Sequence, residues 1–173
     1  MFPSIAGAIV LLAGCGAIGF YLAAQEGFRV QDLQEFKKAL MVLSSEIEHM
    51  RSPLPMACAN IAKRTKEPIS TLFAHFSKLL TENDGETAYQ LWVQTIESQK
   101  NRMYLAEEDW DAIEGFGKTL GYLDKHMQQS AITCTIGYID EKTTELQTQS
   151  EKNKRMYRSL GVIGGLLLVV MLW

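Results

Sequence analysis

The sequence predicts an all-α protein, an antiparallel helical bundle with N-terminal and C-terminal transmembrane helices. All 17 basic and 20 acidic side chains lie between residues 26 and 158, so both ends of the chain are free of charge. Between these ends, apolar side chains recur at steps of three and four, the spacing of one helix face. No stretch keeps the period-two alternation of a half-buried strand. We therefore expect transmembrane helices at 1–25 and 159–173 and a soluble helical-bundle domain at 26–158.

The N-terminal segment is long enough to cross a bilayer. Residues 5–24 are uncharged and mostly apolar, and as a helix they would cover about 30 Å, the thickness of the hydrocarbon core. No Lys or Arg precedes them, which disfavours a cleaved signal peptide. Leu12-Ala13-Gly14-Cys15 matches a lipobox, but the apolar run continues beyond Cys15. We favour a transmembrane helix and keep a lipoprotein anchored at Cys15 as an alternative.

The C-terminal segment 159–173 is shorter, about 22 Å as a helix. The arginines before it can extend to one membrane surface while Trp173 lies at the other. Gly161 and Gly165 have the small-xxx-small spacing that lets membrane helices pack closely, although glycine is also common in such helices. Both interpretations of the glycines stay open.

Basic side chains follow the first apolar segment and precede the second, and neither outer end carries one. By the positive-inside rule, the middle of the chain faces the cytoplasm and both termini face outward. The basic residues are Arg29, Lys37, Lys38, Lys152, Lys154, Arg155 and Arg158.

The apolar positions of the middle predict its helices in order. The first has an apolar stripe and ends at Ser52-Pro53-Leu54-Pro55 because proline lacks an N–H group. The stripe consists of Val30, Leu33, Phe36, Leu40, Leu43, Ile47 and Met50. A short helix over 56–64 follows, and a third begins after Glu67-Pro68. The turn at Asn83-Asp84-Gly85 precedes a fourth. The apolar positions of the third and fourth helices are Leu72, Phe73, Phe76, Leu79, Leu80, Ala88, Trp92 and Ile96.

The fifth helix opens with acidic side chains, which suit the positive end of a helix dipole. Its apolar stripe extends from Trp110 to Leu123, and Gly121 marks a break. Asp124 is the predicted N-cap of the last helix, which has Gly137 as its one weak point and is expected to continue into 159–173. Short connections favour antiparallel packing. The apolar face predicted for the last helix consists of Met127, Ala131, Cys134 and Tyr138.

The residue patterns indicate no active site. A single E-x-x-H, Glu46 to His49, lacks the second copy that a di-iron bundle needs, so a surface pair is the better interpretation. Glu107, Asp111 and Glu114 share a helix face and leave a cation site open, with a solvated helix start favoured. The cysteines are too widely spaced for a disulfide framework or a zinc site. Neither a phosphate-binding loop nor a basic stripe for nucleic acid is present in the sequence.

Three motifs and the apolar tail form a further pattern in this sequence. The first motif is Leu43-Ser-Ser-Glu46-Ile47 with Pro53-Leu54, Ala57 and Ile61-Ala62. The second is Gly85-Glu86-Thr87 with Trp92. The third, F-G-x-x-L-G-x-x-D-x-x-x-Q, runs from Phe116 to Gln128, and the tail begins at Ser159. Together they resemble the stage III sporulation protein AB family of endospore-forming bacteria. The resemblance covers essentially the whole chain, including both apolar ends, and looser parts resemble the cytoplasmic domains of the type II secretion F protein.

This resemblance implies a non-enzymatic platform subunit of the secretion-like complex that links mother cell and forespore. It implies a place in the mother-cell membrane and no cofactor, metal, nucleic acid or small-molecule substrate. The implied partners are membrane lipid and other stage III sporulation A-operon proteins, a cytoplasmic ATPase and membrane subunits among them. The alternative is a membrane-tethered sensor or ligand-binding domain. The candidate packing or partner residues are Glu46, Pro53, Leu54, Ala57, Trp92, Phe116, Gly117, Leu120, Gly121, Asp124 and Gln128, with Gly161 and Gly165 for membrane-helix packing.

Overall fold

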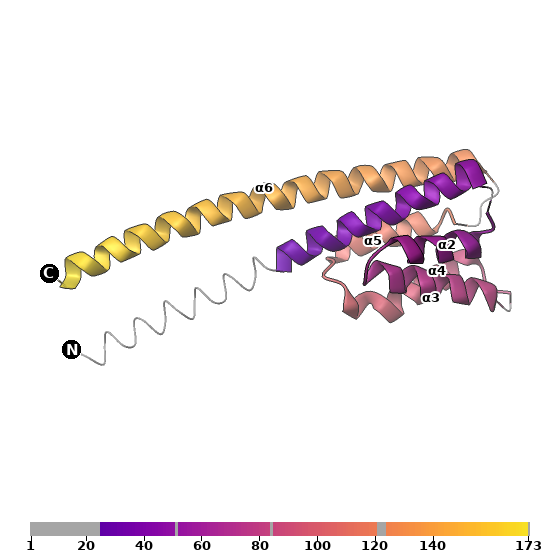
Figure 1. The fold of residues 1–173 in the computed structure, drawn as a ribbon, viewed down its shortest axis with the longest axis horizontal. Coiled ribbons are helices and arrows are strands. Elements are labelled where there is room, and N and C mark those ends of the chain that lie inside the picture. Colours follow the sequence, from indigo (N-terminus) through magenta and orange to yellow (C-terminus); the bar gives the residue numbers. More distant parts are fainter. Residues whose placement is uncertain (1–24, 51, 84, 121–123, 173) are drawn as a thin grey trace.

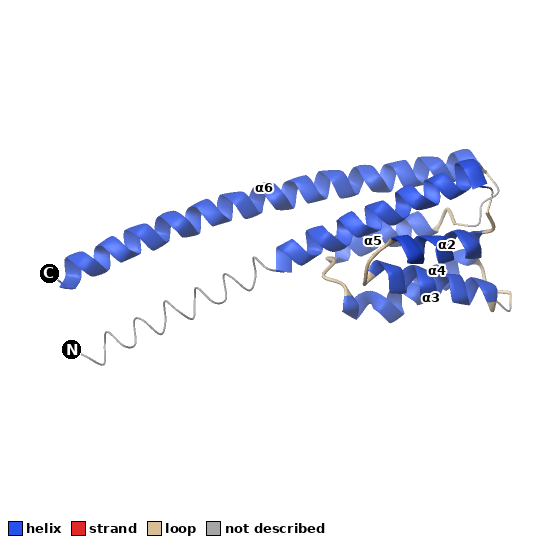
Figure 2. Cartoon of the chain, in the orientation of Figure 1, coloured by secondary structure: helices blue, strands red, loops and turns tan. Residues whose placement is uncertain are grey.

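The chain is helical in the parts that the computed structural model describes, residues 25–50, 52–83, 85–120 and 124–172 (Figures 1 and 2). Side chains are described up to residue 151, apart from residues 49 and 50. No strand occurs in these ranges, which confirms the predicted all-α class. In order, the elements are a helix over 25–45, the π-helix η1 (Glu46–Met50), α2 (Leu54–Arg64), α3 (Ile69–Thr81), α4 (Ala88–Gln99), the 3-10 helix η2 (Lys100–Arg102), α5 (Glu107–Gly117) and α6 (Lys125–Leu172).

The 25–45 helix and α6 lie side by side and run antiparallel, and we call this pair the hairpin (Figure 1). Near its middle, Lys37 Nζ lies 2.6 Å from Asp140 Oδ1. We call the end of the hairpin where the 25–45 helix begins its open end, and the end where α6 begins its closed end. At the open end, Glu26 lines the same surface hollow as Glu151. Residue numbers therefore rise along one helix while they fall along the other. Consequently, the chain enters and leaves the described bundle at the same end.

The four short helices pack beside the half of the hairpin where α6 begins (Figure 1). Each contacts the next one in the chain, from α2 to α5, and α5 in turn contacts α6. Ser77 Oγ of α3 donates to the carbonyl oxygen of Pro55 in α2 at 2.8 Å. Sequential neighbours thus pack against one another, as the short connections predicted.

Local signals account for the turn before α4. Asn83 Oδ1 accepts hydrogen bonds from the backbone N–H groups of Gly85 and Glu86 at 3.0 and 2.8 Å. Gly85 has φ +113, a value that glycine adopts without strain. Thr87 and Gln90 then form a capping box, in which each side chain accepts a hydrogen bond from the other's backbone N–H. These bonds satisfy N–H groups that have no partner in the first turn.

The core is an aromatic cluster centred on Trp92 of α4, which is 0% exposed. Its ring centroid lies 4.9 Å from that of Phe76 in α3 and 6.0 Å from that of Phe116 in α5. Phe36 of the 25–45 helix lies 6.5 Å away. The indole N–H donates to the carbonyl oxygen of Ile113 at 3.0 Å, so its polar atom is satisfied inside the core. The apolar stripes predicted on these four helices therefore meet at one side chain.

The end of α5 differs from the predicted position. The helix ends at Gly117, before Gly121, because the backbone N–H groups of residues 118–120 bond to carbonyls three residues back and tighten the chain into a turn. Leu120 still reaches the core and is 7% exposed. Gly121 and Leu123 lie outside the described residues. The sequence stripe therefore identified a buried leucine but assigned it to a helix that had already ended.

The start of α2 also differs. The predicted helix over 56–64 begins two residues earlier, at Leu54. Pro53 is its N-cap residue, and Pro55 lies in the first turn, where a missing N–H leaves no helical carbonyl unpaired. The prolines thus end one helix and begin the next.

The buried face of α6 matches the predicted one only in part. Ala131 and Tyr138 are half-buried, and Tyr138 packs against the core. Met127 and Cys134 are exposed. Thr135 and Thr143 are buried instead, and their hydroxyls donate to the carbonyl oxygens four residues back at 2.9 and 2.8 Å. A threonine whose hydroxyl is satisfied within its own helix can be buried like an apolar residue. The face that packs inward consists of Ile132, Thr135, Ile139, Thr143 and Leu146.

The predicted membrane spans are not confirmed. Nearly all of segment 1–25 lies outside the described residues. Residues 159–172 form the last part of α6, which continues through Gly137 to Leu172 as one helix, as predicted. Within the described residues, no helix contains a stretch long and apolar enough to cross a bilayer.

Candidate functional site

The polar centre of the molecule is a carboxylate shared by both helices of the hairpin and by α5. Asp109, in the first turn of α5, is 0% exposed. Arg29 of the 25–45 helix donates to its Oδ2 from Nε at 2.7 Å and to its Oδ1 from Nη2 at 3.0 Å. Tyr138 of α6 donates to Oδ1 at 2.9 Å, and the backbone N–H of Ala106 donates to Oδ2 at 2.9 Å. We call Arg29, Asp109 and Tyr138 the Asp109 junction.

The donors of the Asp109 junction match the needs of a buried charge. A buried carboxylate is tolerated where it is paired and its oxygens are hydrogen-bonded, and a planar guanidinium can supply two parallel bonds. The hydrogen bond to Asp109 holds the pKa of the Arg29 guanidinium well above its usual range, against the effect of burial. Burial, followed by the bond to Asp109, raises the pKa of Tyr138. Tyr138 therefore keeps its proton and remains a donor at neutral pH.

A chain of ion pairs extends the Asp109 junction to the surface. Arg29 Nη2 also lies 2.7 Å from Glu108 Oε1, which is 3.1 Å from Lys142 Nζ. Lys142 in turn lies 3.0 Å from Glu145. The bonds from Arg29 and then Lys142 lower the pKa of Glu108. Exposed ion pairs contribute little to stability, so we expect the bonds to the buried Asp109 carboxylate to contribute more than this chain to joining the three helices.

The acidic face considered as a cation site does not gather into one. Glu107 pairs with Lys100 at 2.8 Å, and Glu114 accepts a hydrogen bond from the Tyr89 hydroxyl at 2.7 Å. Asp111 is exposed. In the part of the chain that the structure describes, no three His, Cys, Asp or Glu side chains are placed to hold a metal ion. The described side chains therefore give the cation-site interpretation no support.

One feature of the sequence points indirectly to Asp109. It stands among the acidic residues that open α5, but a helix dipole favours any of them equally. Only the packing of α5 against the hairpin distinguishes the buried carboxylate from its exposed neighbours.

Glu46, a predicted motif residue, is also a buried acid, 3% exposed. It begins the π-helix η1 and accepts hydrogen bonds from Ser52 Oγ at 2.9 Å and from Asn60 Nδ2 at 3.2 Å. Glu46 therefore ties the end of the first helix to α2 across the proline turn. The side chain of His49, the other member of the E-x-x-H pattern, lies outside the described residues.

The motif residues Trp92, Phe116, Gly117 and Leu120 meet in the aromatic core. A Cβ added at Gly117 would lie 1.9 Å from Trp92 Cδ1, so only glycine leaves room for the indole ring. The third motif thus encodes a close approach of α5 to Trp92. Sequence analysis predicted a packing or partner role for these residues. The structure shows packing contacts for them.

The remaining motif residues lie at junctions between elements. Pro53 caps α2, Leu54 begins it, and Ala57 is buried in its first turns. Asp124 precedes α6, and its Oδ1 accepts a hydrogen bond from the backbone N–H of His126 at 2.8 Å, as predicted for an N-cap. Gln128 is half-buried. Gly121 lies outside the described residues, and Gly161 and Gly165 lie on α6 beyond the part whose side chains are described.

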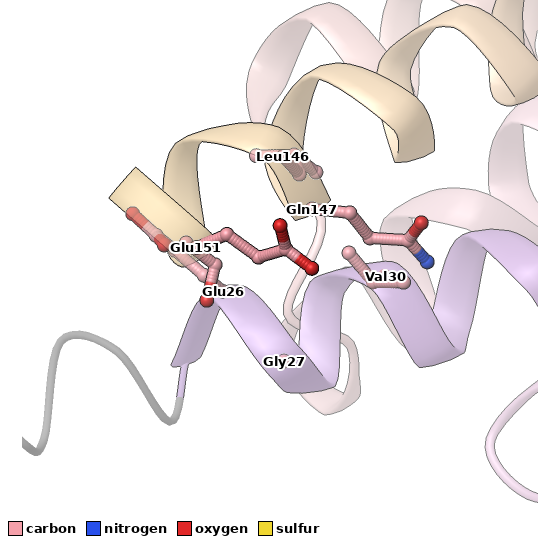
Figure 3. Close-up of a pocket in the computed structure, with 7 residues that line it drawn as sticks. Glu26, Gly27, Val30, Leu146, Gln147 and Glu151 are labelled. Atoms are coloured by element: carbon pink, nitrogen blue, oxygen red, sulfur yellow. The ribbon is translucent and has the colours of Figure 1, made fainter. Parts of the chain in front are cut away.

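A hollow of about 280 Å³ lies at the open end of the hairpin. Figure 3 shows Glu26 and Val30 of the 25–45 helix facing Leu146, Gln147 and Glu151 of α6. The hollow is open to the surface and lies where the chain enters and leaves the bundle.

The described cysteines differ in exposure. Cys58 is buried, and burial raises the pKa of its thiol to about 12. Cys134 is exposed on α6. Cys15, the position of the lipobox match, lies outside the described residues.

Comparison with known proteins identifies the family. The family model described as stage III sporulation protein AB matches residues 4–173. The chain belongs to the stage III sporulation protein AB family. Stage III sporulation protein AB of Bacillus subtilis (strain 168) is 30% identical to it over 166 residues, which are 96% of each chain. A solved structure of a stage III sporulation protein AB matches with a TM-score of 0.67 and 27% identity, over 72% of this chain and 97% of that one.

The stage III sporulation protein AB resemblance predicted from the motifs is thereby confirmed. The protein is a sporulation protein of this family, and the family is not a known enzyme family.

Proposed function

We propose that this protein is a non-enzymatic membrane subunit of the platform in the secretion-like complex that joins mother cell and forespore. The observation that carries the proposal is the hairpin, whose open end brings the first and last parts of the charged middle together at Glu26 and Glu151. Beyond these residues the sequence becomes free of charge within a few turns on either side. An anchor on both sides of one hairpin would fix the bundle relative to a membrane surface.

The interior of the bundle supports a scaffold in preference to a catalyst. The space between α3, α4, α5 and the 25–45 helix is filled by the aromatic cluster around Trp92. The buried carboxylates Asp109 and Glu46 are both engaged in bonds that join one helix to another. These polar groups stabilise the arrangement of the helices, which a subunit that transmits or resists force needs.

The partners we propose follow from the family. They are a cytoplasmic ATPase, membrane subunits and other stage III sporulation A-operon proteins, with the bundle in the mother-cell cytoplasm. The described surface offers several helices away from the open end of the hairpin for such contacts (Figure 1).

Extraction of membranes from sporulating cells with alkaline carbonate tests the anchor. The full chain should stay in the pellet, as should variants that lack either 1–24 or 159–173 alone. A variant that lacks both segments should be released. Release of the full chain by carbonate would contradict the proposal.

Photo-crosslinking in sporulating cells tests the partners. A photoreactive residue at Met56 or Lys63, both exposed on α2, should give products that contain the ATPase or a membrane neighbour. The matched control is Phe76, which is 0% exposed and should crosslink only within the chain. If the α2 positions give no product with either class of protein, the platform role is wrong.

Labelling of cysteines tests the side of the membrane. In a Cys15→Ser variant, exposed Cys134 should react with a membrane-impermeant maleimide only after the cells are permeabilised, and so should Thr148→Cys. Cys58 should stay unlabelled in both conditions because it is buried. Labelling of Cys134 in intact protoplasts would place the bundle outside.

A further inference from the structure

Two exposed aromatic rings stack on each other at the end of the bundle where the 25–45 helix begins. Phe28 is 47% exposed and Tyr104 is 51% exposed, and their ring centroids lie 5.0 Å apart with an interplanar angle of 27°. Phe28 belongs to the first turns of the 25–45 helix, and Tyr104 belongs to the connection between α4 and α5. Figure 1 shows this connection at the same end of the bundle as the start of the helix.

The connection that carries Tyr104 is firmly held. Met103, the residue before, is 8% exposed and belongs to the core. The backbone N–H of Tyr104 donates to Asp32 Oδ2 at 2.8 Å. Asp32 is itself 7% exposed, and burial raises the pKa of its carboxyl group. The backbone at Tyr104 is therefore held in place while the Tyr104 ring stays exposed beside Phe28.

The other large apolar side chains that are exposed in the described part of the chain are methionines. Met41, Met56 and Met127 lie on separate elements, the 25–45 helix, α2 and α6. Single exposed apolar residues are common and need no partner. The Phe28–Tyr104 pair differs because it joins two segments into one aromatic surface at one end of the molecule.

The position of the pair relative to the apolar segment indicates what covers it. Phe28 follows Gln25, the last residue of the segment 1–25, by three positions, which is about 4.5 Å along a helix axis. The headgroup layer on each side of a hydrocarbon core is about 5–8 Å thick. Aromatic side chains are enriched in that layer, where a tyrosine can keep its hydroxyl in water and its ring against lipid.

The charges around the pair are compatible with an anionic lipid surface. Arg102, two residues before Tyr104, is exposed and has no ion-pair partner among the described residues. Glu26 is near in sequence, but positions two apart on a helix point to different sides. Figure 3 shows Glu26 at the hollow between the hairpin helices. Glu107 is paired with Lys100.

We propose that the Phe28–Tyr104 pair is a membrane-contact surface that lies in the lipid headgroup layer and fixes the tilt of the bundle against the membrane. This inference rests on the membrane anchor proposed above and adds a second contact, on the connection between α4 and α5. The occupant is lipid, so the contact should form in vesicles without any other protein.

Lipid quenching in reconstituted vesicles tests the proposal. The full chain, with Cys15→Ser and Cys134→Ser, is labelled with an environment-sensitive fluorophore at Tyr104→Cys, and the matched control carries it at Met127→Cys, which is similarly exposed at the closed end of the hairpin. Buried Cys58 stays unlabelled. The vesicles contain anionic phosphatidylglycerol and a lipid with a spin label on its headgroup. The label at residue 104 should lose most of its fluorescence, and the label at residue 127 should lose none.

A second labelled variant keeps the aromatic pair intact. A fluorophore at Arg102→Cys should also be quenched, and additional Phe28→Ser and Tyr104→Ser substitutions should reduce that quenching while the chain stays in the vesicle. If the spin-labelled lipid quenches the labels at residues 102, 104 and 127 to the same extent in a carbonate-resistant chain, this inference is wrong and the anchor still stands. Extraction of the chain by carbonate would instead refute the anchor itself.

Discussion

The aromatic core and the Asp109 junction both hold the 25–45 helix against α5, but they do so by different forces. In the core, Phe36 and Phe116 meet across Trp92 through apolar contact, which is non-directional and scales with buried area. In the Asp109 junction, Arg29 reaches Asp109 through bonds that depend on the position of each atom. The apolar region should therefore lose stability in proportion to what is removed. The polar region should fail when a single partner is lost.

The largest effect is expected at the centre of the core. Trp92→Ala should reduce the free energy of unfolding by about 3–5 kcal/mol, because it removes the side chain that four helices share. Trp92→Phe keeps an aromatic ring and should lose much less. Urea unfolding of the detergent-solubilised chain, followed by circular dichroism, measures both. Equal losses in the two variants would show that the indole N–H bond, and not the ring, holds the core.

Asp109→Ala should come next, at about 3 kcal/mol, because it removes the buried carboxylate that accepts hydrogen bonds from the half-buried Arg29 guanidinium and Tyr138 hydroxyl. The loss is at the lower end of the usual range, since Arg29 keeps Glu108 as a partner. The matched control is Glu108→Ala, which removes the exposed neighbour and should have a much smaller effect. If the two variants unfold at the same urea concentration, the buried position of Asp109 is not what stabilises the junction.

Two glycines test how tightly the aromatic core is packed. Gly117→Ala should destabilise by about 1–3 kcal/mol, because its methyl group would overlap the Trp92 ring. Gly137→Ala on α6 meets nothing within 4 Å and should stabilise the chain by up to about 1 kcal/mol through helix propensity. Thermal unfolding of both variants in the same detergent decides the matter. A stable Gly117→Ala variant would mean that Trp92 can move aside.

A smaller effect is expected outside both regions, at the start of α4. Thr87→Ala should reduce stability by about 1 kcal/mol, since it removes the side chain that accepts from Gln90 N–H. Thr87→Ser keeps the capping oxygen and should behave like the original chain. This pair supplies the scale of a local polar contact against which the Asp109 junction is compared. A loss as large as that of Asp109→Ala would remove the distinction.

The last prediction concerns alkaline pH, because we expect neither the aromatic core nor the Asp109 junction to change near neutral pH. Tyr138 has a raised pKa in the folded chain, so on raising the pH the unfolded chain releases this proton first, near its ordinary pKa of about 10. The stabilisation from Tyr138 is therefore complete below that pH and is lost as the pH rises further. Tyr138→Phe should show a shallower loss of stability in the same alkaline range, measured by urea unfolding. Parallel pH profiles would show that burial and the bond to Asp109 do not raise the pKa of Tyr138.

The apolar region was predictable because its side chains repeat with the period of a helix. Leu33, Phe36, Leu40 and Leu43 were placed on one face by their spacing alone, and the structure buries all four. The same rule failed on α6, where Thr135 and Thr143 are buried and Met127 is exposed. A hydroxyl that bonds to its own helix is invisible to a search for apolar side chains. The same periodicity predicted that α5 continues beyond Gly117. Leu120 fits the apolar spacing of that helix, but it lies in the turn that follows and is buried there.

The candidate residues were found as motifs, and the structure gives several of them a packing role that a motif does not contain. The motif places Gly117 next to Phe116, and the structure shows why this residue is glycine: a Cβ atom there would overlap the Trp92 ring. Glu46 was half of an incomplete metal pattern until Ser52 and Asn60 were seen to bond to it.

By itself, the sequence determined that the chain is helical, where most helices begin and end, and to which family it belongs, because local periodicity, prolines and motifs are written in neighbouring residues. Only the tertiary structure decided which of several similar acids is buried and which aromatic residues remain outside. Asp109 and Glu108 are adjacent in sequence, and only the approach of Arg29 and Tyr138 makes one of them the centre of a junction. Phe28 and Tyr104 become one surface because the chain folds back. Contacts between distant segments depend on the packing of the whole chain, which no local pattern records.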